Sequence, residues 1–390
     1  MTFSNTLPVP DSIAQQYLDQ LLSVIQQQIT DAGGKITFAD YMKLCLYAPG
    51  LGYYSAGSQK LGQQGDFTTA PEISALFSRT LSRQIKDVFQ QLEQANILEF
   101  GAGSGKMAVD ILKELENDQC LPEQYYIIEA SADLRQRQHQ TVQETIPHLA
   151  DKVTWLNTLP ENFVGVVLAN EVCDAMPVHC LQFESGKVRE RYIKNDGQQL
   201  QWCAGKISLP SLAKRAAEIQ SIIGDSDYVT EVNLAAEGWL ASIADKLRQG
   251  AIFILDYGYP QATYYHPQRT NGSLMCYYQH HGHDNPLILQ GLQDITAHVD
   301  FTALAQTAID NDLEVAGFQS QADFLLAGGI TELTLPNNDA DPLVSLQQAS
   351  EIKRLTLPTE MGENFKVLTL CRNIGQLLPR IQLADRRYSL

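Results

Sequence analysis

The stretch NILEFGAGSGKM (residues 96–107) places Gly101, Gly103 and Gly105 at alternate positions directly after an apolar run. An apolar run followed by glycines is typical of a buried β-strand that turns into a helix, where open α/β sheets bind ligands. Without a Cβ at these positions, the backbone can approach a ligand closely. A tight strand–helix turn that binds nothing is the alternative, so the surrounding residues must decide between the two.

The spacing of the glycines argues against two common nucleotide-binding loops. A P-loop requires G-x-x-x-x-G-K-[ST], but only three residues separate Gly101 from Gly105. Met107 also stands where a serine or threonine would coordinate magnesium. A dinucleotide-binding loop requires G-x-G-x-x-G, and Lys106 occupies the place of its third glycine.

The acids near the loop fit a different ligand, S-adenosyl-L-methionine. This molecule has no phosphate and carries a positively charged sulfonium and an ammonium group. Glu99 places a carboxylate at the lip of the loop, where it suits that positive end. Glu129 ends the next apolar run, where an acid can accept both ribose hydroxyls; a solvated acid at a strand end is the alternative. We therefore expect S-adenosyl-L-methionine to be the cofactor.

The chain around this loop alternates apolar runs with helical patterns. Continuous apolar runs indicate strands that are covered on both faces, and their alternation with helices indicates a parallel sheet. The fold class is therefore α/β. Strands are expected at 97–100, 125–128, 153–156, 164–169 and 251–255, and helices at 73–92, 107–116, 131–144, 230–249 and 301–309.

Helical spacing and composition divide the chain into segments. Helices are expected at 11–30 and 38–46, followed by a long aromatic-rich loop at 48–70. We assign 1–74 to N-terminal helices and a cofactor-covering loop, and 374–390 to a C-terminal tail. The core comprises 75–177, 229–259 and 298–373. Residues 178–228, which open with a hairpin turning at 185–186, and 260–297 are interpreted as insertions on the substrate side of the sheet.

Bulk properties exclude several classes of protein. The 390 residues have a formal net charge of −17 and no basic stripe, which argues against nucleic acid and anionic membranes as partners. No apolar run approaches the ~20 residues of a membrane span. The seven cysteines are scattered without a C-x-x-C pair, as expected for free thiols in a reducing compartment. A cytoplasmic location is therefore expected.

Seven segments together resemble one known family, the MidA-like class I methyltransferases, whose mitochondrial members are arginine methyltransferases of respiratory complex I assembly. They occur in the family's order over residues 37–373. The segments are GDFTTAPEIS (65–74), LEFGAGSGKMAVDIL (98–112), YYIIEAS (125–131), LANEVCDAMPVH (168–179), ILDYG (254–258), DITAHVDFTAL (294–304) and EMGENFKVLTL (360–370). The resemblance implies the Rossmann-like class I methyltransferase sheet, closed by an antiparallel hairpin of 313–318 and 365–371.

The resemblance also implies further cofactor-binding residues. Ala102 fits the family's glycine motif, and Asn157 stands where an oxygen can accept the adenine amino group. The segment 65–74 is expected to fold over the cofactor, which makes Asp66, Thr69 and Glu72 candidates. Thr69-x-x-Glu72 also resembles a helix capping box, so a purely structural role is the alternative.

The segment NEVCD at 170–174 follows the fourth strand, next to the expected position of the transferable methyl group. Asn170 is expected to contact the cofactor side, whereas Glu171 and Asp174 are expected to hold the acceptor. Paired carboxylates suit a guanidinium because bidentate bonding fixes its plane. A turn stabilised by capping carboxylates is the alternative.

The histidine-rich segment at 280–284 is interpreted as a polar substrate-side loop, and no metal ligands are expected. The sequence thus favours a class I methyltransferase that acts on an arginine of a partner protein, by resemblance a respiratory-complex subunit. A cofactor-binding assembly factor that needs no catalysis and a nicotinamide dehydrogenase are the alternatives.

Overall fold

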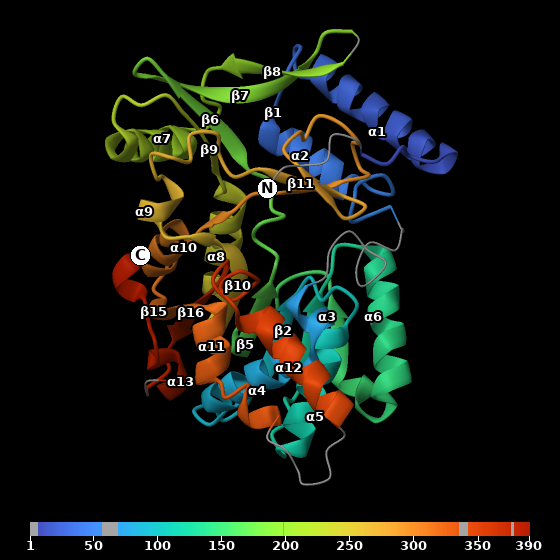
Figure 1. Ribbon diagram of the computed structural model, residues 1–390, viewed down its shortest axis with the longest axis vertical. Coiled ribbons are helices and arrows are strands. Elements are labelled where there is room, and N and C mark those ends of the chain that lie inside the picture. The colour runs from blue at the N-terminus through green and yellow to red at the C-terminus, as the bar shows by residue number, and fades with distance from the viewer. Residues whose placement is uncertain (1–6, 57–68, 198, 335–341, 376–377) are drawn as a thin grey trace.

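The computed structural model describes residues 7–56, 69–197, 199–334, 342–375 and 378–390, and Figure 1 shows that they form two lobes. The larger lobe contains a central sheet with helices on both faces. The smaller lobe combines a second sheet with the N-terminal helices, so segments from the start and the middle of the chain lie together.

Seven strands form the central sheet in the order β15-β16-β10-β5-β2-β3-β4, and the short β14 pairs with the end of β10. β16 pairs antiparallel with both neighbours, so it runs against the other strands. This confirms the expected mostly parallel sheet and the antiparallel pairing of its last two strands. The bounds are β2 Asn96–Phe100, β3 Tyr125–Ile128, β4 Val153–Leu156, β5 Phe163–Asn170, β10 Leu247–Tyr259, β14 Val299–Asp300, β15 Glu314–Ser320 and β16 Phe365–Arg372.

Helices cover both faces of this sheet because successive strand residues point to opposite sides. In β2, for example, Ile97 packs into one core and Leu98 into the other. The first core includes residues of α3 (Ala70–Ile73), α4 (Ala75–Phe89), α5 (Lys106–Asn117), α6 (Ala132–Thr145), α11 (Gln321–Ala327), α12 (Pro342–Thr356) and α13 (Pro379–Gln382). The second core includes residues of α8 (Leu234–Lys246) and α10 (Phe301–Asp310). Short 3-10 helices occur at Pro147–Lys152, Glu332–Thr334 and Arg387–Ser389.

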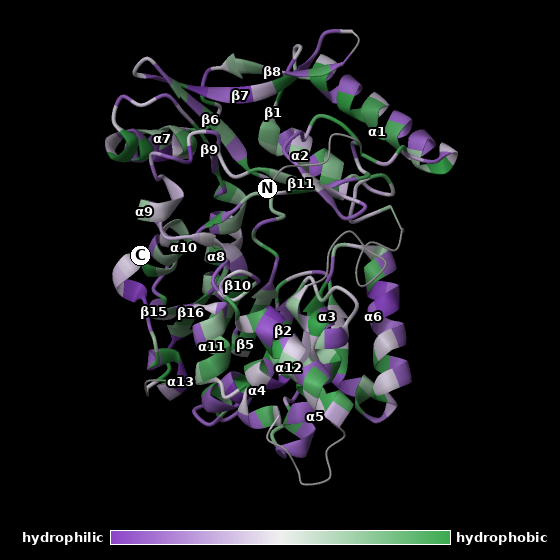
Figure 2. Ribbon diagram, in the orientation of Figure 1, coloured by the Kyte–Doolittle hydropathy of each residue, from purple (hydrophilic) through white to green (hydrophobic). Residues whose placement is uncertain are grey.

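The smaller lobe joins the N-terminal helices to both insertions through a shared apolar core. Ile25 and Tyr41 from the N-terminal helices, Cys180 and Ile193 from the first insertion and Ile295 from the second belong to one buried cluster. Figure 2 shows hydrophobic and hydrophilic residues alternating along α1, as expected for a helix with one exposed face. The elements are α1 Ser12–Asp31, β1 Ile36–Thr37, α2 Phe38–Tyr47, β6 His179–Glu184, β7 Lys187–Asn195, β8 Leu200–Gly205, α7 Pro210–Ile223, β9 Tyr228–Val232, α9 Gln261–Tyr264, β11 Met275–Tyr278, β12 His281–His283 and β13 Asp294–Thr296.

One expected helix is wrong in its bounds. The sequence predicts a helix at 230–249, but β9 extends to Val232 and α8 ends at Lys246. β-Branched residues such as Val229 and Thr230 favour the strand. Asn233 then starts the helix, because its side chain accepts the backbone N–H of Ala236 at 2.9 Å.

Candidate active site

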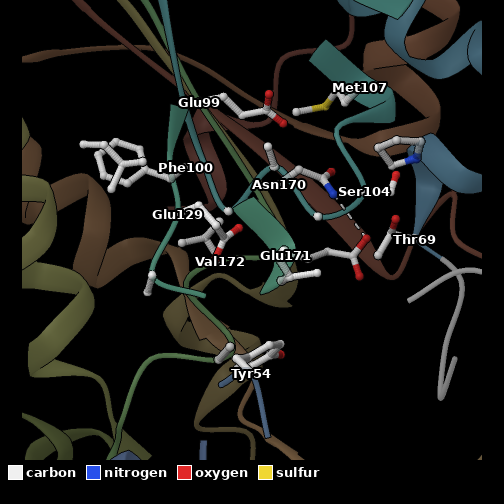
Figure 3. Close-up of a pocket in the computed structure, with 18 of the residues that line it drawn as sticks. Tyr54, Thr69, Glu99, Phe100, Ser104, Met107, Glu129, Asn170, Glu171 and Val172 are labelled. Carbon is white, nitrogen blue, oxygen red and sulfur yellow. Dashed lines mark hydrogen bonds between the residues drawn. The ribbon is translucent and has the colours of Figure 1, made fainter. Parts of the chain in front are cut away.

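A cavity of about 360 Å³ lies at the carboxyl ends of β2, β3 and β5. Its walls come from both lobes: the glycine loop and the loop after β5 belong to the larger lobe, whereas Tyr47 and Tyr54 come from the N-terminal segment of the smaller lobe. Figure 3 shows Glu99, Glu129 and Glu171 around this space. The position agrees with the general rule that parallel α/β sheets bind ligands beyond the carboxyl ends of their strands.

The glycine loop begins where β2 ends. Gly101 and Gly103 have φ values of +61° and +55°, in the left-handed region that favours glycine. Both residues line the cavity. The Ser104 hydroxyl donates a hydrogen bond to Glu72, which ties the loop to α3.

Glu99 lies at the end of β2 and is only 1% exposed. The Tyr125 hydroxyl donates a hydrogen bond to its Oε2 at 2.7 Å. Burial raises the pKa of Glu99 to about 7, and the bond from Tyr125 opposes that shift. A positively charged ligand group in this cavity would favour the ionised carboxylate.

Glu129 follows β3, and a hydrogen-bond network fixes its carboxylate. Oε1 accepts the backbone N–H of Ser131, and Oε2 accepts the Gln138 side-chain amide, both at 2.9 Å. Gln138 also donates to the Gly103 carbonyl at 3.0 Å, so the acid and the glycine loop share one support. These contacts and the place of Glu129 on the cavity wall argue against the alternative of a solvated acid at a strand end. Burial raises the pKa of Glu129.

The loop after β5 presents an amide and two acids to the same cavity. Asn170 Nδ2 donates to Glu171 Oε1 at 3.3 Å. Asn170 Oδ1 is buried and accepts no hydrogen bond from the residues that the structure describes, which leaves an acceptor at the cavity wall. Glu171 has a φ of +54° and donates its backbone N–H to the Leu255 carbonyl at 2.9 Å.

The two acids of this loop share a buried, negatively charged environment. Burial and the charge of Asp174 raise the pKa of Glu171 to about 8. Burial likewise raises the pKa of Asp174 to about 6, although the Tyr257 hydroxyl donates a hydrogen bond that opposes the shift. Both acids therefore have room to become more ionised when a cation enters.

Most of the expected site residues meet at this cavity. Those that line it are Thr69, Glu72, Glu99, Gly101, Ala102, Gly103, Glu129, Asn170, Glu171 and Asp174. Asp66 lies outside the described residues.

Two expected cofactor residues do not line the cavity. Gly105 starts α5 with a φ of +83°, and a Cβ there would lie 3.2 Å from the Gln138 Cα, so its surroundings are protein rather than ligand. Asn157 follows β4, but its Oδ1 accepts Arg135 Nη1 at 2.8 Å at the surface. Arg135 on α6 thus occupies the oxygen that was expected to face adenine.

The capping-box interpretation is also wrong at its side chains. Thr69 is the N-cap residue of α3 but makes no side-chain capping bond. The carboxylate of Glu72 accepts from Ser104 instead. Both residues therefore face the cavity region rather than closing a helix end.

Sequence reasoning missed Tyr47, Tyr54, Ser104 and Trp239, which also line the cavity. The indole N–H of Trp239 is buried and unpaired within the described part of the chain. The two tyrosines lie in the aromatic-rich region that begins the long loop, and this was the one signal that could have indicated them. In the described residues, no group of three or more His, Cys, Asp and Glu is placed to hold a metal ion.

Comparison with known proteins identifies the class. A family model described as S-adenosyl-L-methionine-dependent methyltransferase matches residues 80–319. A solved superfamily member from Burkholderia thailandensis, bound to S-adenosyl-homocysteine, is 38% identical to this chain, with a TM-score of 0.93. The match covers 99% of this chain and 100% of that one. The fold and the cavity are thus those of a class I methyltransferase.

This chain belongs to that S-adenosyl-L-methionine-dependent methyltransferase family. Two more distant relatives carry more specific names. Protein arginine methyltransferase NDUFAF7 homolog, mitochondrial, from Drosophila melanogaster is 29% identical, with 92% of this chain and 84% of the relative covered. Human protein arginine methyltransferase NDUFAF7, mitochondrial, is 27% identical, with 91% and 82% covered.

The residues of the cavity fit the cofactor of this family. Gly101 and Gly103 leave backbone bare, and the carboxylates of Glu99 and Glu129 suit an ammonium and hydroxyl groups. Asn170 Oδ1, which accepts no hydrogen bond within the described residues, offers a further acceptor. Within the described residues, no helix is long and apolar enough to cross a bilayer.

Proposed function

We propose that this methyltransferase modifies a guanidinium nitrogen of an arginine side chain in a partner protein. The observation that carries the proposal is that Glu171 and Asp174 line the same cavity as the glycine loop. Two carboxylates at this place suit a planar cation with several N–H donors. The names of the relatives from fly and human agree with this acceptor.

The roles of the cofactor-side residues follow from their positions. Glu99 would pair with the ammonium of S-adenosyl-L-methionine, and Glu129 would accept the ribose hydroxyls. The backbone of Gly101–Gly103 would pack against the ligand, and Asn170 would direct its oxygen toward it. When bound, the cofactor supplies an electrophilic methyl group on a sulfonium. Thr69 and Glu72 are proposed to contact the same ligand from the α3 side.

Glu171 and Asp174 would orient the acceptor and handle its proton. A guanidinium is a poor nucleophile while protonated, because its pKa exceeds 12. In the transfer, a nitrogen–carbon bond forms, the carbon–sulfur bond breaks and one N–H proton leaves. Glu171 lines the cavity beside the proposed acceptor, and its ionised form, which a bound cation favours, would accept that proton.

The proposal is tested by supplying tritiated S-adenosyl-L-methionine and a lysate of cells that lack this protein. The wild-type chain should label a protein band, and mass spectrometry should locate methylarginine in it. Glu171→Gln should reduce labelling by about 100-fold and leave the affinity for S-adenosyl-homocysteine unchanged. The matched control Glu184→Gln changes an exposed acid on β6 and should label normally.

Three results would redirect the proposal. Wild-type labelling by Glu171→Gln would remove the role of Glu171. Methyl groups on other residues would remove the arginine acceptor. Tight binding of S-adenosyl-homocysteine without any labelled product would favour a cofactor-binding assembly factor that needs no catalysis.

We further infer that the protein acts in a reducing compartment, and we propose the cytoplasm. All seven cysteines are free, and five of them are buried. The names of the relatives include the word mitochondrial, so the location needs its own test. Fractionation of cells that make the protein should recover it with cytosolic markers, and recovery with a mitochondrial matrix marker would contradict the proposal.

A further inference from the structure

Two tyrosine rings face the acidic end of the cavity from the smaller lobe. Tyr47 is the last residue of α2. Tyr54 lies in the segment of turns that follows this helix. Their rings are stacked with centroids 5.5 Å apart and an interplanar angle of 24°. In the view of Figure 3, Tyr54 lies on the side of Glu171 away from Glu99 and Met107. The two tyrosines therefore lie near Glu171 and Asp174, the acids proposed to hold the acceptor, rather than near the glycine loop.

The hydroxyl groups of both tyrosines are engaged with protein. The Tyr47 hydroxyl donates to the Ala175 carbonyl at 3.0 Å. The Tyr54 hydroxyl lies 3.1 Å from both carboxylate oxygens of Asp294, which is fully buried on β13. Burial raises the pKa of each tyrosine, and the charge of Asp294 adds to this effect. The phenols thus stay neutral, and both residues line the cavity.

The charge of the cavity wall is one-sided. Its ionisable side chains other than tyrosine are acidic, and none of the described lining residues is Lys, Arg or His. Glu171 and Asp174 therefore have no basic partner on the wall. A planar cation is attracted by an aromatic face through its π-system, and by carboxylates without a basic partner through hydrogen bonds.

Three separate segments assemble this end of the cavity. Tyr54 comes from the N-terminal segment, Asp294 from the second insertion and Asp174 from the loop after β5. The backbone also connects them, because the Ala297 N–H donates to the Asp174 carbonyl at 3.0 Å. The insertion thus supports both the aromatic and the acidic side of the acceptor region.

We propose that the Tyr54 ring, backed by Tyr47, is a specificity-determining surface that receives the planar cation of the acceptor. Asp294 is a positioning residue, because it holds Tyr54 through the hydroxyl and not through contact with the acceptor. The inference rests on the proposed arginine acceptor and adds the residues that distinguish this cation from a neutral group of the same shape.

Two small probes separate charge from shape. N-acetyl-arginine methylamide carries the guanidinium, and N-acetyl-citrulline methylamide carries a neutral urea of nearly the same outline. Each is titrated by ligand-observed NMR into protein saturated with S-adenosyl-homocysteine. Wild type should bind the arginine probe at least about tenfold more tightly, since only this probe pairs with ionised carboxylates.

Variants at position 54 then test the ring. Tyr54→Leu should weaken the arginine probe about fivefold, which is the range of a cation–π contact, and leave the citrulline probe nearly unchanged. Tyr54→Phe keeps the ring and should keep most of the preference. Asp294→Asn still offers an oxygen to the Tyr54 hydroxyl. Its preference for the arginine probe should lie between those of Tyr54→Leu and Tyr54→Phe. Tyr17→Leu, on the exposed side of α1, is the matched control and should behave as wild type.

The outcomes separate this inference from the function on which it rests. Wild-type preference in Tyr54→Leu, or equal loss of both probes, would overturn it. If Tyr54→Leu does not fold, Tyr54→Met takes its place, because methionine has a longer and more flexible side chain without an aromatic ring. The ratio of the affinities for the two probes then decides in the same way. Failure of wild type to bind S-adenosyl-homocysteine would instead contradict the cofactor site, and wild type without preference for either probe would contradict the arginine acceptor.

Discussion

The carboxylate of Asp256 accepts the backbone N–H of Cys173 at 2.9 Å, and this bond fixes the loop that carries the acceptor acids. The same Oδ2 lies 3.2 Å from the Asp174 N–H, and Oδ1 accepts the Tyr257 N–H at 2.9 Å. The loop needs such support because Glu171 is held in a left-handed conformation, which costs a non-glycine residue roughly 1–2 kcal/mol. Asp256 lies within β10, so the sheet itself positions the site.

Replacement of Asp256 should therefore weaken the fold and the transfer reaction together. Asp256→Ala leaves two buried N–H groups and one part-buried N–H group without this acceptor and should lower the free energy of unfolding by about 2–4 kcal/mol. Asp256→Asn keeps one side-chain oxygen and should lower the free energy of unfolding by about half as much. Urea denaturation measures both, with the exposed Asp151→Ala as control. A variant Asp256→Ala as stable as wild type would show that the loop holds its shape without this carboxylate.

The raised pKa of Glu171 predicts how stability depends on pH. Its pKa is about 8 in the folded chain and near the ordinary 4.5 in the unfolded chain. The folded state therefore binds the proton more tightly, so this contribution is complete below pH 4.5 and is lost as the pH rises through 8. Between pH 5 and pH 8 the loss is on the order of 3 kcal/mol.

Glu171→Gln removes the titrating group and should flatten that decline. Urea denaturation of wild type and variant at half-unit steps from pH 5 to pH 8.5 measures the difference in slope. Glu184→Gln, which changes an exposed acid, should keep the wild-type slope. Parallel curves for Glu171→Gln and wild type would mean that Glu171 is ionised throughout this range.

Sequence patterns locate the central sheet well because its strands are buried on both faces. The runs at 125–128 and 153–156 coincide with β3 and β4. In the smaller lobe the strands are half exposed and mix polar with apolar residues, as in β8, where the pattern of burial is irregular. β8, β9 and α7 were therefore not expected from the sequence.

The same contrast applies to the site. Glu99, Glu129 and Glu171 were foreseeable, because the carboxyl ends of parallel strands meet at one edge of the sheet. Tyr54 and Asp294 were not, because they are 240 residues apart and meet only through the packing of the smaller lobe. No local pattern encodes such a contact.

Asn157 shows the opposite error. Its position after β4 was inferred correctly, since β4 ends at Leu156. The direction of its side chain was not, because Arg135 on α6 takes its oxygen at the surface. Strand position alone therefore does not determine which polar group reaches a ligand.

The contact of Tyr125 with Glu99 predicts a pH-dependent affinity for the cofactor. Glu99 has a pKa of about 7 in the empty cavity, and an ammonium group pairs only with its ionised form. The affinity for S-adenosyl-homocysteine, measured by isothermal titration, should rise as the pH increases from 6 to 8. Tyr125→Phe removes a bond that favours the ionised form, so the rise should move to higher pH.

Glu99→Gln supplies the control for this prediction. It keeps the shape of the side chain and cannot ionise, so its affinity should be lower and constant over the same pH range. A pH dependence retained in Glu99→Gln would assign the effect to another group.

The two ends of the glycine loop should respond differently to the same substitution. Gly101 and Gly105 both have positive φ, so alanine at either costs roughly 1–2 kcal/mol of backbone strain. A Cβ at Gly101 would lie 3.5 Å from Val172 Cγ2, within the cavity wall, whereas a Cβ at Gly105 would press on the α6 backbone. Gly101→Ala should thus reduce the affinity for S-adenosyl-homocysteine by about tenfold or more, with a modest loss of stability.

Gly105→Ala should cause a larger loss in melting temperature than Gly101→Ala and a smaller loss in affinity for S-adenosyl-homocysteine. The reason is that its Cβ would lie 3.2 Å from the Gln138 Cα on α6. Gly186→Ala isolates the strain, since Gly186 has a φ of +70° and its Cβ would meet only Asp225 Oδ1 at 4.0 Å. Thermal denaturation and isothermal titration of the three variants measure both quantities. Equal losses of affinity at 101 and 105 would indicate that Gly105 also contacts the ligand, as the sequence pattern implied, and that α6 moves when the ligand binds.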